Sequence, residues 1–190
     1  MANSDNPSGL KPVRHASGAP YNGATNMYHV ASGNSSVIAV GDPVIITGAA
    51  DADGIPTVAA ATAGGSNRIT GVMVSLAQNG GLTRDSGVAT TASTNQYINV
   101  CDDPDVSFEV QNDGTMSAGQ IGLNAAFVYS AASTYGVSGV ELDTSTLATT
   151  AALQLKVLRL VRRQGNAIGE FAKVEVKINE PTTIADTAGV

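Results

Sequence analysis

The sequence predicts an all-β protein with many turns, and its composition is the first reason. The 190 residues are 43% hydrophobic but only 4% aromatic, with no tryptophan, so alanine, valine, isoleucine and leucine supply the apolar mass. The 21 glycines, together with many serines and threonines, leave few long helical runs. This balance favours short strands joined by turns. The length suits one domain with a real core, or one domain with an arm.

Two alternating runs around an acidic turn are the second reason. Residues 102–105 read Asp-Asp-Pro-Asp, and the proline, with its fixed φ and no N–H, interrupts any continuous strand. After the turn, Val106, Phe108 and Val110 alternate with polar residues, which is the period of a strand with one buried face. The only cysteine, Cys101, precedes the turn. We expect it to be a small buried residue without a disulfide.

Residues 1–34 predict an extended arm, because glycine, proline and asparagine recur too often for a helix. Spaced apolar residues give this arm anchors, so we expect it to lie along its own domain or a neighbouring subunit. Both histidines, His15 and His29, belong to the arm. No residue at ligand spacing accompanies them, so we expect surface or interface side chains. The residues that we expect to bind a partner are Leu10, Pro12, Val13, Tyr21, Met27 and Tyr28.

We expect residues 35–180 to form a β-domain and residues 181–190 to form a short C-terminal tail. The expected strands before the last unit lie at 37–40, 44–47, 68–76, 97–101, 106–111 and 119–129. A hairpin-type turn is expected at 51–54, and residues 78–87 are expected to form an exposed loop. Residues 130–150 are rich in serine, threonine and glycine, which predicts a long surface loop with one helical turn near Ser145.

The last unit, residues 153–179, predicts a hairpin. Residues 170–179 alternate strictly between apolar and polar side chains. The residues expected to face the core are Ala172, Val174, Val176 and Ile178. The residues expected to face outward are Phe171, Lys173, Glu175 and Lys177. The run at 153–162 fits the period of a helix or of a strand, and we choose a strand because the connection at 163–169 has hairpin length.

Charge is sparse and unevenly distributed. The chain carries 10 lysines and arginines against 16 acidic residues, for a net charge of −6. A globally acidic chain repels phosphate backbones, so nucleic acid is not expected as a partner. The late strands carry a basic stripe, which is either an ordinary solvated face or a surface that meets acidic groups on a neighbour. The stripe consists of Lys156, Arg159, Arg162, Arg163, Lys173 and Lys177.

The sequence offers no recognisable catalytic apparatus. The acidic turn, with Glu109, could bind a hard cation, but Pro104 and Val106 interrupt the calcium-loop pattern. We favour aspartates that accept hydrogen bonds from turn N–H groups. The nucleophile-elbow, phosphate-loop and zinc-helix motifs are absent. We therefore expect a non-enzyme without catalytic, cofactor-binding or metal-binding residues. No signal peptide or apolar membrane span is recognised, so a soluble protein made in the cytoplasm is expected.

Several phrases, taken in their order and spacing, carry a family resemblance. They are residues 8–14 with 18–21, 40–44, 69–72, 97–105 with 108–111, and 155–161 with 174–179. The chain resembles the small head-decoration, or cement, proteins of tailed bacteriophages. The resemblance implies a single antiparallel β-barrel or a tulip-like or sandwich domain, often trimeric, with an N-terminal arm laid over capsid subunits.

The resemblance also implies a function. The chain would be a non-enzymatic structural protein of the virion, made in the host cytoplasm, that binds the outside of the capsid and stabilises it. Its partners would be the major capsid protein and itself, as a homotrimer, with no nucleic acid and no membrane. The alternative is a receptor- or carbohydrate-binding β-domain on the virion surface, which the scarcity of aromatic residues disfavours. A hydrolase is the third hypothesis, and it requires convergent histidines or carboxylates in a pocket.

Overall fold

The computed structural model describes residues 3–65, 67–77, 87–88, 96–133, 136 and 138–184. Within these ranges the chain is nearly all β, which confirms the predicted fold class. The helical segments of the described ranges are two single 3₁₀ turns, η1 (Ala118–Gln120) and η2 (Thr144–Thr146). No helix in the described part of the chain is long and apolar enough to cross a membrane.

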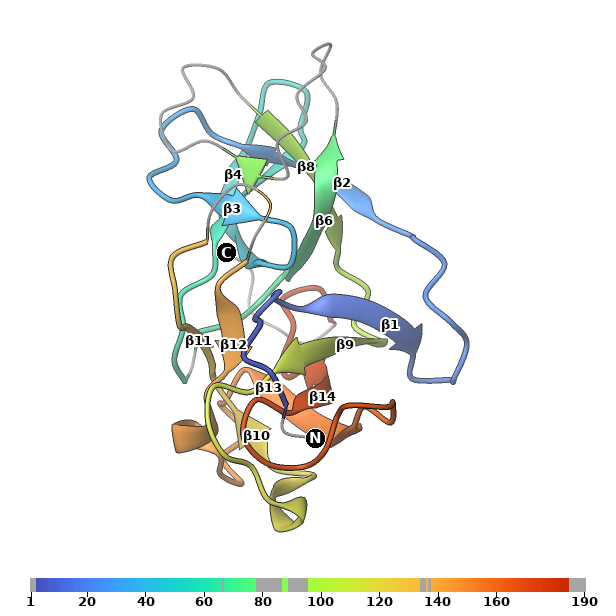
Figure 1. Cartoon of the computed structure of the whole chain (residues 1–190). Helices are drawn as coiled ribbons and strands as arrows, with labels where there is room; N and C mark the ends of the chain where they lie inside the picture. Colours follow the sequence, from blue (N-terminus) through green and yellow to red (C-terminus); the bar gives the residue numbers. More distant parts are fainter. Residues whose placement is uncertain are drawn as a thin grey trace.

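Five strands close into a barrel. Their order around it is β2 (Asn26–Val30), β5 (Pro56–Ala60), β4 (Pro43–Ala50), β6 (Gly71–Ala77) and β8 (Gln96–Cys101). All neighbours are antiparallel except β2 and β5, which run parallel and close the barrel through the pair His29 and Thr57. Figure 1 shows this barrel at one end of the body.

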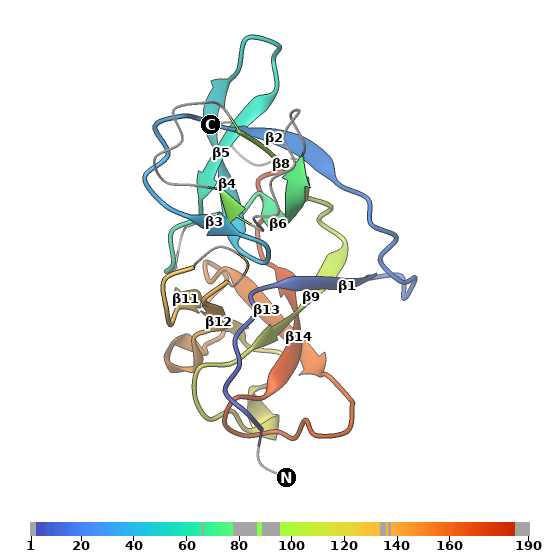
Figure 2. The same ribbon diagram turned by 45° about the horizontal axis from the view of Figure 1, so that its top comes forward.

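Five further strands form an open antiparallel sheet at the other end of the body (Figures 1 and 2). Their order is β1 (Lys11–His15), β9 (Val106–Gln111), β14 (Lys173–Ile178), β13 (Leu155–Leu160) and β10 (Asn124–Ala125). Two small pairs complete the fold: β11 (Phe127–Tyr129) with β12 (Val140–Leu142), and β3 (Ile38–Ala39) with β7 (Gly87–Val88). The strands therefore divide between a barrel and a sheet, so of the expected alternatives, a single barrel or a tulip-like or sandwich domain, the chain does not form the single barrel.

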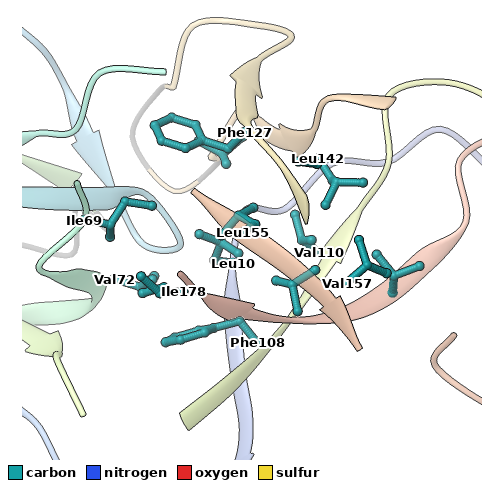
Figure 3. Close-up of a cluster of buried hydrophobic side chains, with 14 of the residues drawn as sticks. Leu10, Ile69, Val72, Phe108, Val110, Phe127, Leu142, Leu155, Val157 and Ile178 are labelled. Carbon is teal, nitrogen blue, oxygen red and sulfur yellow. The ribbon is translucent and has the colours of Figure 1, made fainter. Parts of the chain in front are cut away.

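The hydrophobic core has two parts, and one of them joins the barrel to the sheet. The interior of the barrel is filled by Tyr28, Val30, Ile38, Val44, Val58, Met73, Ile98 and Val100. The larger cluster covers the inner face of the sheet and contains Phe108, Leu155 and Val157 together with Leu10, Phe127 and Leu142 (Figure 3). Val72 and Cys101 enter the same cluster from barrel strands. Because apolar burial spans both parts, we expect them to fold as one unit.

The N-terminal segment is part of this body, which corrects the expectation of an arm. Its first strand, β1, is the edge of the open sheet, and its second, β2, is a barrel strand. The backbone N–H of Leu10 donates to the carbonyl of Gly41 at 2.9 Å. Gly9 has a φ of 67°, and a Cβ there would lie 2.5 Å from the Gly41 oxygen, so only glycine permits this approach.

Several local predictions are resolved by the structure. Residues 155–160 form a strand, as chosen, and the helical turn near Ser145 is present as η2. The long loop expected at 130–150 is wrong in one respect, because it contains β12, whose three residues are buried. The strand expected at 119–129 is interrupted by a turn after η1 and is replaced by β10 and β11. Most of the loop expected at 78–87 lies outside the described residues.

Candidate interaction surfaces

The six residues predicted to bind a partner divide into three groups. Leu10 and Tyr28 are 1% and 7% exposed. They are core residues of their own chain, so their assignment as partner contacts is wrong. Pro12 and Tyr21 are half-buried. The Tyr21 hydroxyl donates to the Ala24 carbonyl at 2.8 Å, which closes the turn between β1 and β2.

The remaining two residues are accessible. Val13 is 37% exposed and Met27 is 48% exposed, which places them among the few large apolar side chains on the surface. The connection between them, residues 16–25, loops out from the body (Figure 1). We call Val13, Met27 and residues 16–25 the N-terminal surface. Val13 lies on β1 of the open sheet and Met27 on β2 of the barrel, and exposed apolar residues of this kind are candidate contacts for a partner.

The acidic turn at 102–105 is the corner between β8 and β9, as the sequence indicated. Asp102 binds the N-terminal segment: it accepts from the Tyr28 hydroxyl at 2.7 Å and from the Asn26 side-chain amide at 3.0 Å. Burial, and then the bond to Asp102, raises the pKa of Tyr28, so its hydroxyl stays a donor. This carboxylate therefore holds β2 against the end of β8.

The other carboxylates of the turn are also engaged within the chain. Asp103 lies 3.3 Å from His15 and accepts from the Asp105 N–H at 2.8 Å. Asp105 pairs with Lys177 at 3.0 Å. Within the described ranges, no three histidine, cysteine or carboxylate side chains lie close enough together to hold a metal ion. The geometry is that of a structural corner whose charge is compensated by β1 and β14.

Glu175 is buried, although its place in the alternating pattern predicted an outward side chain. It is 2% exposed and pairs with Arg14 at 3.0 Å and Arg159 at 3.4 Å. The Ser107 hydroxyl donates to it at 2.7 Å. It does face outward from the sheet, but the long side chains from β1 and β13 cover it. Sequence periodicity could not reveal this, because Arg14 lies far from Glu175 along the chain.

His29 is likewise buried, at 6% exposed, which corrects its assignment as a surface residue. Its Nδ1 lies 2.8 Å from the Thr57 hydroxyl, at the parallel seam of the barrel. Its Nε2 is buried with no hydrogen-bond partner among the described residues. His15, in contrast, is half-buried beside Asp103. The two histidines do not converge on a common site.

Asp42 is a second buried carboxylate, and it joins the barrel to the β11–β12 region. It accepts from the Ala39 N–H at 2.8 Å, the Ser133 hydroxyl at 2.7 Å and the Ser138 hydroxyl at 2.6 Å. Burial raises the pKa of Asp42, and these three hydrogen bonds oppose that shift. The sequence signal for this residue is its place in a Gly-Asp-Pro turn between the expected strands at 37–40 and 44–47, which does not indicate that its carboxylate is buried.

A cavity of about 530 Å³ adjoins this cluster. Its lining residues are Ser36, Val37, Ala60, Ala61, Thr62, Ala63, Tyr129, Ala132 and Ser133. Among these described lining residues there is no histidine or carboxylate to supply the acid–base groups that hydrolysis needs. Burial raises the pKa of Tyr129, which keeps its hydroxyl neutral. The cavity can accept small apolar groups.

No family model, curated protein or solved structure matches this chain. Its function is therefore inferred from its residues and their geometry. The features that bear on function are the N-terminal surface, the buried carboxylates that tie the parts together, and the charged outer face of the sheet.

Proposed function

We propose that this protein is a non-enzymatic structural protein of a bacteriophage virion, which binds the outside of the capsid and stabilises it. The short sequence segments that resemble cement proteins, taken in their order and spacing, support the proposal. So does the all-β architecture, in which buried apolar contacts and hydrogen-bonded carboxylates tie the barrel to the sheet. The observation that carries it is the N-terminal surface, where Val13 and Met27 stay exposed on a segment that is otherwise packed into the fold.

The proposed mechanism is the burial of surface between subunits. Covering an exposed valine or methionine side chain contributes about 1–2 kcal/mol per subunit, since only the part still in water is gained. Such contacts are weak singly, but a symmetric shell repeats them in every copy, so their effect on the shell adds up. The partners in this proposal are the major capsid protein and further copies of the chain, arranged as a homotrimer.

In this proposal the buried ionisable groups are structural. Asp42 and Glu175 are occupied by hydrogen bonds or ion pairs inside the protein, and Asp102 holds the N-terminal segment. A carboxylate whose lone pairs are already occupied is poorly placed to act as a general base. The rigid attachment of the N-terminal segment would present Val13 and Met27 with little loss of entropy on binding.

Capsid occupancy tests the proposal. Deleting residues 2–30 is not a suitable perturbation, because it would remove buried Leu10 and strand β2. The suitable variant is Val13→Ser with Met27→Ser, and the matched control is Ile168→Ser, at a residue that is 38% exposed. We expect the wild type and the control to cosediment with undecorated capsids and the double variant to bind at least tenfold more weakly. Equal occupancy of all three proteins would exclude a role for the N-terminal surface.

A further inference from the structure

Most of the positive charge of the chain lies on the outward face of the five-stranded sheet. Seven of its ten lysines and arginines are there, and we call them together the cationic face: Lys11, Arg14, Lys156, Arg159, Arg163, Lys173 and Lys177. Three carboxylates share this face, Asp105, Glu109 and Glu175. Two more, Asp5 and Glu141, accept from Gln111, which lies opposite Lys173, so the face with its border carries +2. The rest of the chain carries three cations and eleven carboxylates. Charge is therefore strongly segregated on the molecule.

The cross-strand register explains how these residues share a face. Lys11 lies opposite Glu109, which lies opposite Glu175, which lies opposite Arg159. Directly opposed residues on neighbouring strands point to the same side of a sheet. This register places two pairs of like charge opposite each other: Glu109 with Glu175, and Lys156 with Lys177.

The carboxylates at the centre of this face lie beneath the cations. The Glu175 side chain is 3% exposed, whereas the Arg14 and Arg159 side chains that cover it are 40% and 59% exposed. Glu109 is 17% exposed and is held by the two terminal guanidinium nitrogens of Arg163, Nη2 at 3.0 Å and Nη1 at 3.2 Å. Solvent, or a partner, therefore meets guanidinium and ammonium groups.

Two cavities lie at opposite ends of β14 on this face. One, of about 420 Å³, is lined by Lys156, Lys177 and Asp105, which pairs with Lys177, together with apolar residues, among them Pro104, Pro181 and Ile184. The other, of about 210 Å³, is polar. It is lined by Asn3, Ser4, Asn6, Arg163, Gly165, Asn166, Phe171 and Lys173. The first cavity thus presents two cations and one carboxylate, and the second presents two cations.

One cation in each cavity lacks an ion-pair partner. Among the described residues, Lys156 and Lys173 have no carboxylate within ion-pair distance. Burial lowers the pKa of Lys173, and the nearby Arg163 and Lys11 lower it further, whereas the Glu109 carboxylate opposes this shift. Lys156 lies opposite Lys177, and this pair of like charges is only partly offset by Asp105, which binds Lys177. Both cavities are therefore suited to receive a carboxylate.

We infer that the cationic face is a docking surface for an acidic polypeptide segment of a partner protein, whose carboxylates enter the two cavities. Lys173 and Lys177 are four residues apart on β14, so the cavities are about 13 Å apart. An extended segment with acidic residues four positions apart would match this spacing. The identity of the partner as a capsid protein rests on the proposed function, whereas the chemistry of the face does not.

The observations favour an acidic protein over nucleic acid. The chain as a whole carries a net charge of −6, which opposes a long phosphate backbone more strongly than a short acidic segment. The apolar wall formed by Pro104, Pro181 and Ile184 suits side chains that flank a carboxylate. A specific protein contact combines such apolar packing with a charged rim.

The test uses the full-length protein and a synthetic twelve-residue peptide with glutamates four positions apart, titrated by calorimetry at low salt. Lys156→Gln and Lys173→Gln each remove one charge from the face, and Arg68→Gln removes one elsewhere. We expect each lysine variant to bind the peptide about threefold to fivefold more weakly, and the Arg68 variant to bind like the wild type. Circular dichroism verifies that all three variants fold.

Three results would overturn the inference: no peptide binding, equal weakening in all three variants, or tighter binding of duplex DNA than of the peptide. Cosedimentation of the wild type with undecorated capsids separates this inference from the proposed function. Capsid binding without peptide binding would refute the docking surface alone. Peptide binding without capsid binding would refute the capsid role alone.

Discussion

Replacement of Leu10 by alanine tests whether the N-terminal segment is part of the core. Leu10 is 1% exposed and belongs to the cluster between the sheet and the barrel. Removing a buried leucine side chain costs its transfer free energy and leaves a cavity, so we expect the free energy of unfolding to fall by about 3 kcal/mol. For a chain of this size that corresponds to a melting temperature lower by about 6–12 °C.

The matched control is Val13→Ala, three residues further along the same segment. Val13 is 37% exposed, so we expect a loss of about 0.5 kcal/mol or less. Urea unfolding and calorimetry measure both variants. If Leu10→Ala were as stable as Val13→Ala, the segment would not be packed into the core, and the reasoning that assigns it to the body would fail.

Three further predictions concern the interior. Burial raises the pKa of Asp42 above its value in the unfolded chain, so the folded protein binds a proton at this carboxylate more readily. The contribution of Asp42 to wild-type stability is therefore lost as pH rises through the folded pKa. Asp42→Asn should remove this dependence. If the free energy of unfolding changed equally in both proteins between neutral and acidic pH, the prediction would be refuted. Burial raises the pKa of the Cys101 thiol to about 11, so a thiol reagent should label it only after denaturation, and rapid labelling of the native protein would contradict this. A Cβ at Gly71 would lie 2.4 Å from the Cys101 carbonyl oxygen, whereas one at Gly119 would meet nothing within 4 Å. Gly71→Ala should therefore lower the melting temperature and Gly119→Ala should not, and equal melting curves would be evidence against the close approach.

The sequence was informative where structure is local. Three local predictions follow from side-chain period and turn chemistry: the strand at 170–179, the proline turn at 102–105 and the burial of Cys101. The turn and the buried cysteine are present, and the strand covers residues 173–178, with the buried Glu175 as the exception to its alternation. These features depend on residues within a few positions of one another, so a single sequence contains the signal.

The predictions that the structure contradicts concern residues whose partners lie far away in the sequence. β1 pairs with β9 across almost a hundred residues, and the parallel seam joins His29 to Thr57. Nothing in the local pattern of residues 1–34 distinguishes a strand that pairs with a distant partner from a free arm. Glu175 shows the same limit, because its burial depends on Arg14. For the candidate surfaces, the basic stripe was visible in the sequence, but the carboxylates beneath it were not.

The most direct test of the proposed function is to mix the purified full-length protein with undecorated capsids and measure binding and capsid stability together. We predict saturable binding at a fixed number of copies per shell and a higher capsid melting temperature. Absence of saturable binding, or binding that leaves capsid melting unchanged, would contradict the proposal that this protein cements a shell.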